Sequence, residues 1–160
     1  MAAAPNSSLA AEASSFIDSY WGKTSGSADR VLPYLRSVYA PLVDYYGAEQ
    51  SRASVLQDKS SFIRRWPIRQ TRPLPEPENP TISCNDAAAQ CEITGLRGFE
   101  AVSPDRRAHS VGVVRYSYTV RFADGKPQIV AEASEVVNGA GLAPASSLPP
   151  DRSAPDLSQK

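Results

Sequence analysis

The sequence predicts an α+β fold in which N-terminal helices pack on a curved antiparallel sheet. Apolar residues recur at helical spacing in the first part of the chain, whereas the part after residue 67 alternates between apolar and polar residues, as strands do. Residues 42–67 join the two parts. The chain has 160 residues, which suits one domain with a single core. The expected order is α-α-β-α-β-β-β-β.

Two helices are predicted before residue 41. The first spans residues 8–21, and one face carries Leu9, Ala13, Phe16, Ile17, Tyr20 and Trp21. The second begins near Ser27, a residue type that caps helices. Pro33 lies inside this segment and is tolerated only in a first turn, so we expect this helix to start late or to be distorted.

Residues 42–67 read as a short strand over 42–46, a turn at Gly47, and a third helix. Ser51 is placed to cap that helix, and Pro67 ends it by biasing the preceding residue away from helical geometry. The stripe predicted to face the core consists of Val55, Leu56, Lys59, Phe62, Ile63 and Trp66.

The rest of the ordered chain is predicted to be strands. We expect an edge strand over 68–72, a proline-rich connection, a hairpin of 81–84 and 91–102, and long strands over 109–122 and 128–137. Residues 8–138 then form one domain. Residues 1–7 are expected to be flexible, and 139–160, rich in Gly, Ala, Pro and Ser, to be a disordered tail.

Composition excludes some functions. The formal net charge is zero, which argues against a general nucleic-acid binder. No apolar run approaches the ~20 residues that span a bilayer. The N-terminus has neither the cationic start nor the apolar core of a signal peptide. It fits a cytosolic start, or a mature exported chain that was given a new methionine.

The two cysteines, Cys84 and Cys91, flank a polar loop between strand-like segments. Antiparallel pairing would bring them close enough for a disulfide, which indicates an oxidising compartment. The alternative is two free thiols in a reducing cytosol. A metal site is not expected, because two thiols and a distant His109 do not supply the usual four ligands.

The element order and two local passages resemble the nuclear-transport-factor-2-like (NTF2-like) superfamily, also called the cystatin-like cone fold. The passages are VYAPLVDYYG, similar to the family's helix-to-first-strand junction, and SRASVLQDKSSFIRRWP, similar to its third helix. The resemblance covers residues 9–138 and implies helices on the concave face of the sheet. The arrangement DYYG…VLxDKxxFxxRWP, which spans both passages, also looks like domains of exported bacterial proteins of unassigned function, some of which sit beside peptidase or other catalytic modules.

Enzymes of this superfamily place an acid or a histidine in an aromatic-lined cone. The resemblance therefore implies catalytic candidates Asp44, Tyr46 and Tyr116, with Glu132 as a further acid. Asp44 is either directed inward with Tyr46 or directed to solvent. Candidate pocket residues are Trp21, Tyr46, Trp66, Tyr116 and Tyr118, although the tyrosines equally suit core packing.

Lys59 shares the core-facing stripe of the third helix. We expect its stem to pack while its amine reaches water or Asp58 and other nearby acids. The alternative is a buried lysine nucleophile with a lowered pKa. His109 is the only histidine and is expected near the rim of the sheet, where an exposed structural role is favoured over that of a general base.

Arginines suggest a partner surface. Arg97, Arg115 and Arg121 lie in the predicted sheet and are candidates to contact a protein or an anionic surface. The alternative is a solvated face paired with glutamates, namely Glu92, Glu100, Glu132 and Glu135.

The leading hypothesis is a non-catalytic binding or assembly module of an exported bacterial protein, periplasmic or secreted. Its partner would be another protein, or a second copy meeting it through the sheet. A small apolar ligand is compatible with this view, and no cofactor is expected. The alternatives are a cytoplasmic location and a small-molecule isomerase, cyclase or dehydratase acting inside the cone.

Overall fold

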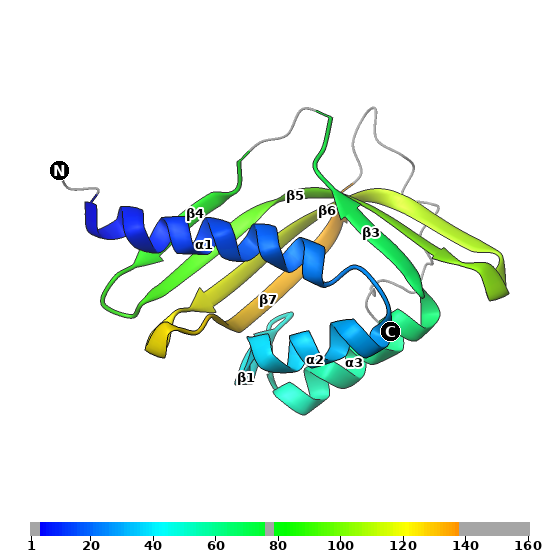
Figure 1. Ribbon diagram of the computed structural model, residues 1–160, viewed down its shortest axis with the longest axis horizontal. Helices are drawn as coiled ribbons and strands as arrows, with labels where there is room; N and C mark the ends of the chain where they lie inside the picture. The colour runs from blue at the N-terminus through cyan, green and yellow to red at the C-terminus, as the bar shows by residue number, and fades with distance from the viewer. Residues whose placement is uncertain (1–3, 76–78, 138–160) are drawn as a thin grey trace.

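Three helices cover one face of a curved sheet in the computed structural model, which describes residues 4–75 and 79–137 (Figure 1). The helices are α1 (Ala4–Lys23), α2 (Ala28–Val38) and α3 (Arg52–Arg65). The strands are β1 (Tyr39–Tyr45), β2 (Ala48–Ser51), β3 (Ile68–Arg72), β4 (Thr81–Asn85), β5 (Gln90–Ser103), β6 (Ala108–Arg121) and β7 (Gln128–Val137). The predicted α+β class is confirmed.

The sheet is mixed, whereas we predicted an antiparallel one. Its order is β2-β1-β7-β6-β5-β3, and β4 also pairs with β5. β1 runs parallel to β7, and the other pairs are antiparallel. A parallel pair needs a long crossover rather than a hairpin. The helix α3 and the strands between β1 and β7 in the chain provide that crossover.

The helix ends follow local signals with two exceptions. The N–H of Ser54 donates to Ser51 Oγ at 3.1 Å, so the predicted cap of α3 is confirmed. α1 begins at Ala4, earlier than the predicted residue 8, and α2 begins at Ala28 without a late start despite Pro33. Residues 1–3 and 139–160, predicted to be flexible or disordered, lie outside the described residues.

The predicted turn at Gly47 closes a hairpin that the sequence pattern did not reveal. Tyr46 and Gly47 both have positive φ, of 55° and 87°, and Tyr45 pairs with Ala48. A two-residue loop with this conformation matches the right-handed twist of a hairpin. β2 therefore forms between the turn and α3, although its four residues carry little apolar character.

The hydrophobic core lies between the helices and the inner face of the sheet, by which we mean the face that the helices cover. Its buried members include Ile17, Val31, Leu35, Val55, Ile93, Tyr118, Val120 and Ile129. The opposite face is called the outer face below.

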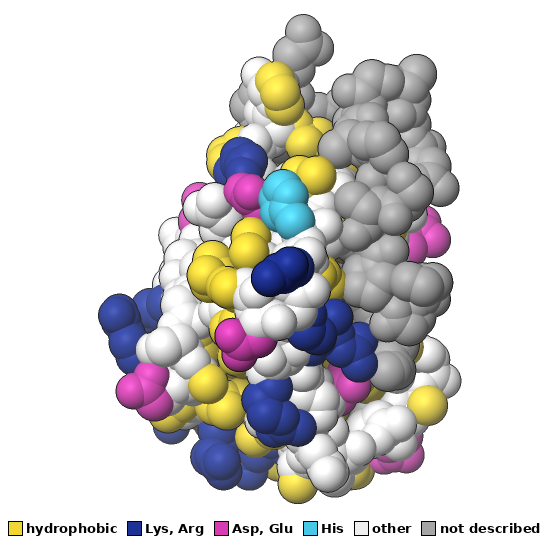
Figure 2. Space-filling model, turned by 90° about the vertical axis from the view of Figure 1, so that its right-hand side faces the viewer, with side chains coloured by type: hydrophobic (Ala, Val, Ile, Leu, Met, Phe, Trp, Pro, Cys, Tyr) yellow, Lys and Arg dark blue, Asp and Glu magenta, His cyan; other side chains and the backbone are white. Residues whose placement is uncertain are grey.

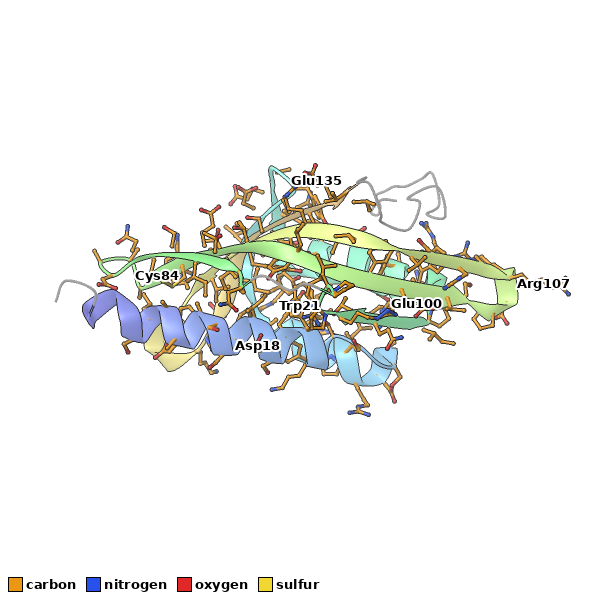
Figure 3. All side chains as sticks on the ribbon, turned by 90° about the horizontal axis from the view of Figure 1, so that it is seen from above. Asp18, Trp21, Cys84, Glu100, Arg107 and Glu135 are labelled. Atoms are coloured by element: carbon orange, nitrogen blue, oxygen red, sulfur yellow. A yellow bond between two sulfur atoms is a disulfide. The ribbon has the colours of Figure 1, made fainter. Side chains whose placement is uncertain are left out.

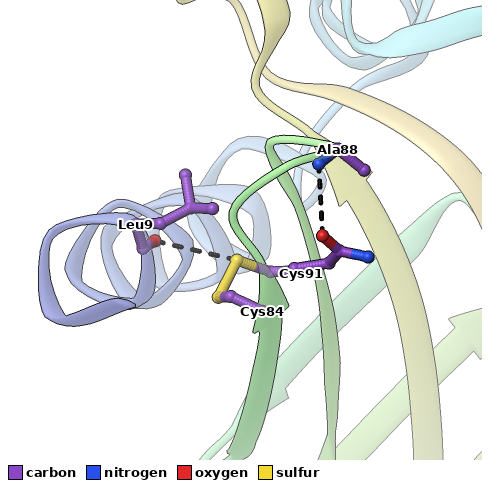
Figure 4. Close-up of a disulfide and its surroundings, with 5 residues drawn as sticks. Leu9, Cys84, Ala88 and Cys91 are labelled. Atoms are coloured by element: carbon purple, nitrogen blue, oxygen red, sulfur yellow. Dashed lines mark hydrogen bonds between the residues drawn. A yellow bond between two sulfur atoms is a disulfide. The ribbon is translucent and has the colours of Figure 1, made fainter. Parts of the chain in front are cut away.

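The predicted disulfide is present. Cys84 and Cys91 are direct partners in the β4–β5 ladder and their sulfurs are bonded. The carbonyl oxygen of Leu9 in α1 lies 3.8 Å from Cys91 Sγ (Figure 4). A disulfide sulfur has no hydrogen to donate, so this is a packing contact. The bond thus lies where the β4–β5 hairpin supports the N-terminal half of α1.

Near the end of β5 and the start of β6, the Glu100 carboxylate accepts from several donors. Arg72 Nη2 lies 2.9 Å and His109 Nε2 2.8 Å from its carboxylate oxygens, and Gln70 Nε2 lies 3.2 Å away. His109 is exposed at this end, as expected. Acidic and basic side chains are interspersed over this end of the molecule (Figure 2). The hydrogen bonds from Arg72, His109 and Gln70 lower the pKa of Glu100 to about 2.

This lowered pKa predicts an acid-dependent contribution to stability. The ionised form of Glu100 is favoured by folding, so the contribution is present above the ordinary pKa of 4.5 and is lost as the pH falls towards about 2. The variant Glu100→Gln should therefore lose less unfolding free energy than the wild type between pH 5 and pH 2. Urea titrations across this pH range measure the free energy of unfolding of both proteins. The prediction is refuted if the free energy falls equally with pH in the wild type and in Glu100→Gln.

Candidate functional site

A buried acid on β7 reaches the inner face because the strand contains an extra residue. Ile129 pairs with Val120 and Ala131 pairs with Thr119, which leaves Val130 without a partner in β6. Side chains in a regular strand alternate between faces, so Glu132 would face outward if buried Ile129 faced inward. The bulge at Val130 reverses the alternation and turns Glu132 into the core.

Glu132 is the acid of a polar cluster inside the cone. Its side chain is 3% exposed, and Lys59 Nζ of α3 lies 2.7 Å from its Oε2. The Tyr39 hydroxyl donates to Oε1, so each carboxylate oxygen has a donor. We call Tyr20, Tyr39, Lys59, Tyr118 and Glu132 the Glu132 cluster.

The tyrosine hydroxyls of the cluster form a chain directed at the acid. The hydroxyl oxygens of Tyr20 and Tyr39 are 3.2 Å apart, and those of Tyr118 and Tyr20 are 3.5 Å apart. Since the proton of Tyr39 is used on Glu132, Tyr39 must accept from Tyr20, and Tyr20 from Tyr118. The hydrogen bonds therefore all point towards the negative charge.

The surroundings of the cluster keep Tyr39 neutral and Lys59 positively charged at neutral pH. Burial raises the pKa of Tyr39 well above its ordinary value, and the charge of Glu132 raises it further. Burial alone would lower the pKa of Lys59, but Glu132 and the surrounding tyrosines raise it well above the ordinary value. Lys59 also lies over the ring of Tyr45, with 5.6 Å from Nζ to the ring centroid.

Lys59 therefore does not have the lowered pKa required of a lysine nucleophile, and that alternative is wrong. Of the two expected surroundings of its amine, access to water agrees with its 20% exposure, whereas Asp58 accepts from the hydroxyl of Tyr45 at 2.5 Å and the acid paired with Lys59 is Glu132. Lys59 reaches across the core to β7, which lies 73 residues further along the chain.

Asp44 is exposed, so the inward position that its catalytic role would require is not observed. In β1 the residue Val43 is buried and Tyr45 is half-buried, and this set faces the core. Tyr46 lies in the hairpin turn, is 44% exposed, and its hydroxyl is 2.8 Å from Ser134 Oγ. The acid inside the cone is Glu132 rather than Asp44.

Three of the candidate pocket residues meet on the inner face. Trp21 makes edge contacts with Tyr116 and Tyr118, at centroid distances of 4.9 and 6.0 Å. Figure 3 shows Trp21 between α1 and the sheet. Trp66 is buried elsewhere, where the guanidinium of Arg106 stacks on it at 4.7 Å.

The candidate partner arginines lie on different faces of the sheet. Leu96 is opposite Arg115 in the β5–β6 ladder, and Arg97 is opposite Val114, so Arg97 and Arg115 point to opposite faces. Arg97 faces inward, which separates it from a surface shared with Arg115 and Arg121. Arg115 is exposed on the outer face and pairs with Glu135 at 2.7 Å.

The outer face also carries a hollow of about 320 Å³ beside residues 95–97 of β5, which pair with β6 on one edge but with neither β3 nor β4 on the other. It is lined by Leu74, Asn79, Thr81, Thr94, Gly95, Leu96 and Arg115. This hollow is separated by the sheet from the Glu132 cluster.

Sequence reasoning recognised only part of the Glu132 cluster. Glu132 was considered both as an interior acid and as an outer partner for arginines, and only the first position is correct. The sequence predicts Tyr20 only as a core-facing residue of the first helix and assigns no role to Tyr39, because hydroxyl partners distant in sequence leave no local signal. The one available signal was Lys59 on an otherwise apolar stripe, since a buried lysine requires an acid.

Two kinds of feature are absent from the residues that the structure describes. Residues 4–75 and 79–137 contain no group of three His, Cys, Asp or Glu side chains arranged to hold a metal ion. Within the same ranges, no helix is long and apolar enough to cross a membrane.

Comparison by sequence gives no relative: no family model and no curated protein matches the chain. Comparison by structure does find similar proteins. An NTF2-like superfamily protein of Salmonella enterica serovar Typhimurium superposes with a TM-score of 0.68 at 11% identity, over 85% of this chain and 96% of that one.

Two further solved structures are similar to this chain, and one of them is an enzyme. The hexachlorocyclohexane dehydrochlorinase LinA-type3 of Novosphingobium barchaimii matches with a TM-score of 0.60 at 13% identity, covering 83% of this chain and 92% of that one. Bd1075 of Bdellovibrio bacteriovorus matches with a TM-score of 0.59 at 13% identity over 79% of this chain, which spans only 40% of that protein. These likenesses, with the order of helices and strands described above, show that the chain has the NTF2-like, cystatin-like cone fold.

Proposed function

We propose that the chain is a non-catalytic binding or assembly module of an exported bacterial protein. The observation that carries this proposal is that the Glu132 carboxylate is buried and already hydrogen-bonded. A substrate must reach a general base, whereas the Glu132 side chain is 3% exposed and its two oxygens already accept from Lys59 and Tyr39. The fold itself fits either function, since it occurs in a dehydrochlorinase and in proteins described only by fold.

The disulfide supports the exported location. Disulfides persist in oxidising compartments and are rare in the cytosol. Cys84 and Cys91 are bonded directly across the β4–β5 ladder, and Cys91 is 1% exposed. A structural crosslink therefore suits the pair better than a redox role.

The proposed partner surface is the outer face of the sheet. Arg115 and Arg121 lie on it, and the Arg115–Glu135 pair is exposed to solvent. Arginine both stacks and forms bidentate hydrogen bonds, so it is favoured at protein interfaces. Either another protein or a second copy of the chain would meet this face.

The alternative, proton transfer inside the cone, is favoured by one observation. Lys59 is 20% exposed, so a small molecule can approach the cluster beside Glu132. The two functions differ in whether Glu132 is a reactive base. We would use 5-nitrobenzisoxazole, which opens when a base removes its ring C–H proton and the N–O bond breaks, releasing a coloured cyanophenolate.

We expect no acceleration over buffer by the wild type, and the same rate for Glu132→Gln. Asp44→Asn is the matched control for an exposed carboxylate, and we expect it to be equally inactive. Acceleration by the wild type and by Asp44→Asn, lost in a folded Glu132→Gln variant, would replace the binding module by the enzyme. Circular dichroism checks the fold of each variant.

A further inference from the structure

Arg97 lies on the inner face within an aromatic setting. Its guanidinium carbon is 5.3 Å from the centroid of the Trp21 ring. That ring contacts Tyr116, which is 3% exposed. Arg97 Nη2 donates to Thr71 Oγ1 of β3 at 3.1 Å. We call Trp21, Thr71, Arg97 and Tyr116 the Arg97 cluster.

The guanidinium of Arg97 has unused donors. An arginine has five N–H donors in a planar fork. The Nε atom of Arg97 is buried and has no hydrogen-bond partner among the described residues. A buried donor without an acceptor destabilises the folded protein, so such a group calls for an explanation.

Arg106 offers a matched comparison within the same chain. Its guanidinium also stacks on a tryptophan, 4.7 Å from the centroid of Trp66. However, its Nε donates to Ser103 Oγ at 3.2 Å, and its Nη2 donates to the carbonyl of Arg65 at 2.9 Å. Arg69 likewise uses its fork on backbone carbonyls of the α1–α2 turn and of Trp66. These two arginines hold the fold together, whereas Arg97 keeps its fork partly free.

We propose that Arg97 binds the carboxylate group of a small organic ligand. Its Nε and a neighbouring Nη would donate to the two carboxylate oxygens, a pairing that the planar fork matches. The body of the ligand would lie against the half-buried ring of Trp21, which Tyr116 supports from behind. This inference rests on the proposed binding function and names the class of ligand for it.

An organic carboxylate suits the Arg97 cluster better than a free phosphate because the site combines a cation with an aromatic ring. Burial lowers the pKa of Arg97 from its ordinary value, whereas Tyr116 and then Asp18 of α1 favour its charged form. A free phosphate has no apolar body to lie against the Trp21 ring, whereas an organic carboxylate does. Figure 3 shows Asp18 and Trp21 on the same helix, beside the sheet.

The Arg97 cluster is within reach of solvent. Trp21, Thr71 and Arg97 are all half-buried rather than buried. A half-buried cation attracts an anion more strongly than an exposed one, because fewer water molecules screen it. A ligand can therefore approach from the surface and satisfy the buried Nε with a small rearrangement.

The test is isothermal titration calorimetry of the full chain with benzoate, a planar carboxylate, and with inorganic phosphate as the comparison anion. Arg97→Lys keeps the charge and removes the fork, and Arg106→Lys is the matched control. We expect saturable benzoate binding to the wild type and to Arg106→Lys, at least tenfold weaker binding to Arg97→Lys, and weaker binding of phosphate than of benzoate.

A second measurement keeps the proposal testable if Arg97→Lys does not fold. The chain has only two tryptophans, so their indole N–H signals in ¹H–¹⁵N spectra can be assigned with one variant. Benzoate should shift the Trp21 signal and leave that of Trp66 in place. The proposal fails if benzoate does not bind, if Arg97→Lys binds it equally well, or if both indoles shift alike. None of these results depends on whether Glu132 acts as a base, so the two proposals fail separately.

Discussion

Replacing Lys59 with methionine should lower the free energy of unfolding by about 3 kcal/mol. The change removes one partner of a buried ion pair and leaves the Glu132 carboxylate, 3% exposed, with the Tyr39 hydroxyl as its one remaining side-chain donor among the described residues. Removal of one member of such a pair typically costs about 3–5 kcal/mol, because a charge is left uncompensated. We expect the lower end, since Lys59 is 20% exposed and water can reach part of the vacated space.

A second variant separates the charge from the packing. In Lys59→Met combined with Glu132→Gln, the side-chain amide of Gln still accepts from Tyr39 but carries no charge. This double variant should recover more than half of the loss, because a neutral pair avoids the desolvation of two ions. Urea unfolding of the wild type, both single variants and the double variant completes the cycle. A double variant that is no more stable than Lys59→Met would show that packing, not charge, explains the loss.

The Glu132 cluster also shows where sequence reasoning fails. In the segment from Gln128 to Val137 no residue type marks Val130 as the extra one, so a regular alternation is the natural expectation. A slip of one residue moves every following side chain to the other face. The position of Glu132 was therefore undecidable from its own strand, whereas Lys59 on an apolar helix face pointed to an unknown acid.

Local signals predicted their own elements well. Ser51 caps α3, the chain leaves helical geometry at Trp66 before Pro67, and the alternation in β6 separates Tyr116 and Tyr118 from Arg115. The resemblance to the cone fold then supplied the arrangement of these elements. It did not supply the direction of β1. No local pattern distinguishes parallel from antiparallel pairing with a strand that lies more than 80 residues further along the chain, as Glu132 lies from its partner Tyr45.

Removing the disulfide should cause the second largest loss in the free energy of unfolding. The double variant Cys84→Ala with Cys91→Ala opens a loop closed at a sequence separation of 7 residues. In the chain-entropy model a crosslink of this span stabilises the folded chain by roughly 2–3 kcal/mol. Cys91 is 1% exposed and contacts Leu9, so the loss of packing adds to this effect. Chemical unfolding of the two proteins measures the difference.

The location of the bond predicts which part of the molecule loosens. The β4–β5 hairpin supports the N-terminal half of α1, so hydrogen exchange should accelerate in β4 and around Leu9, while the Glu132 cluster keeps its protection. Adding a reductant to the wild type should reproduce the loss, and adding it to the double variant should change nothing. A wild type whose stability is indifferent to reductant would remove the argument for an oxidising compartment, and with it the main support for an exported protein.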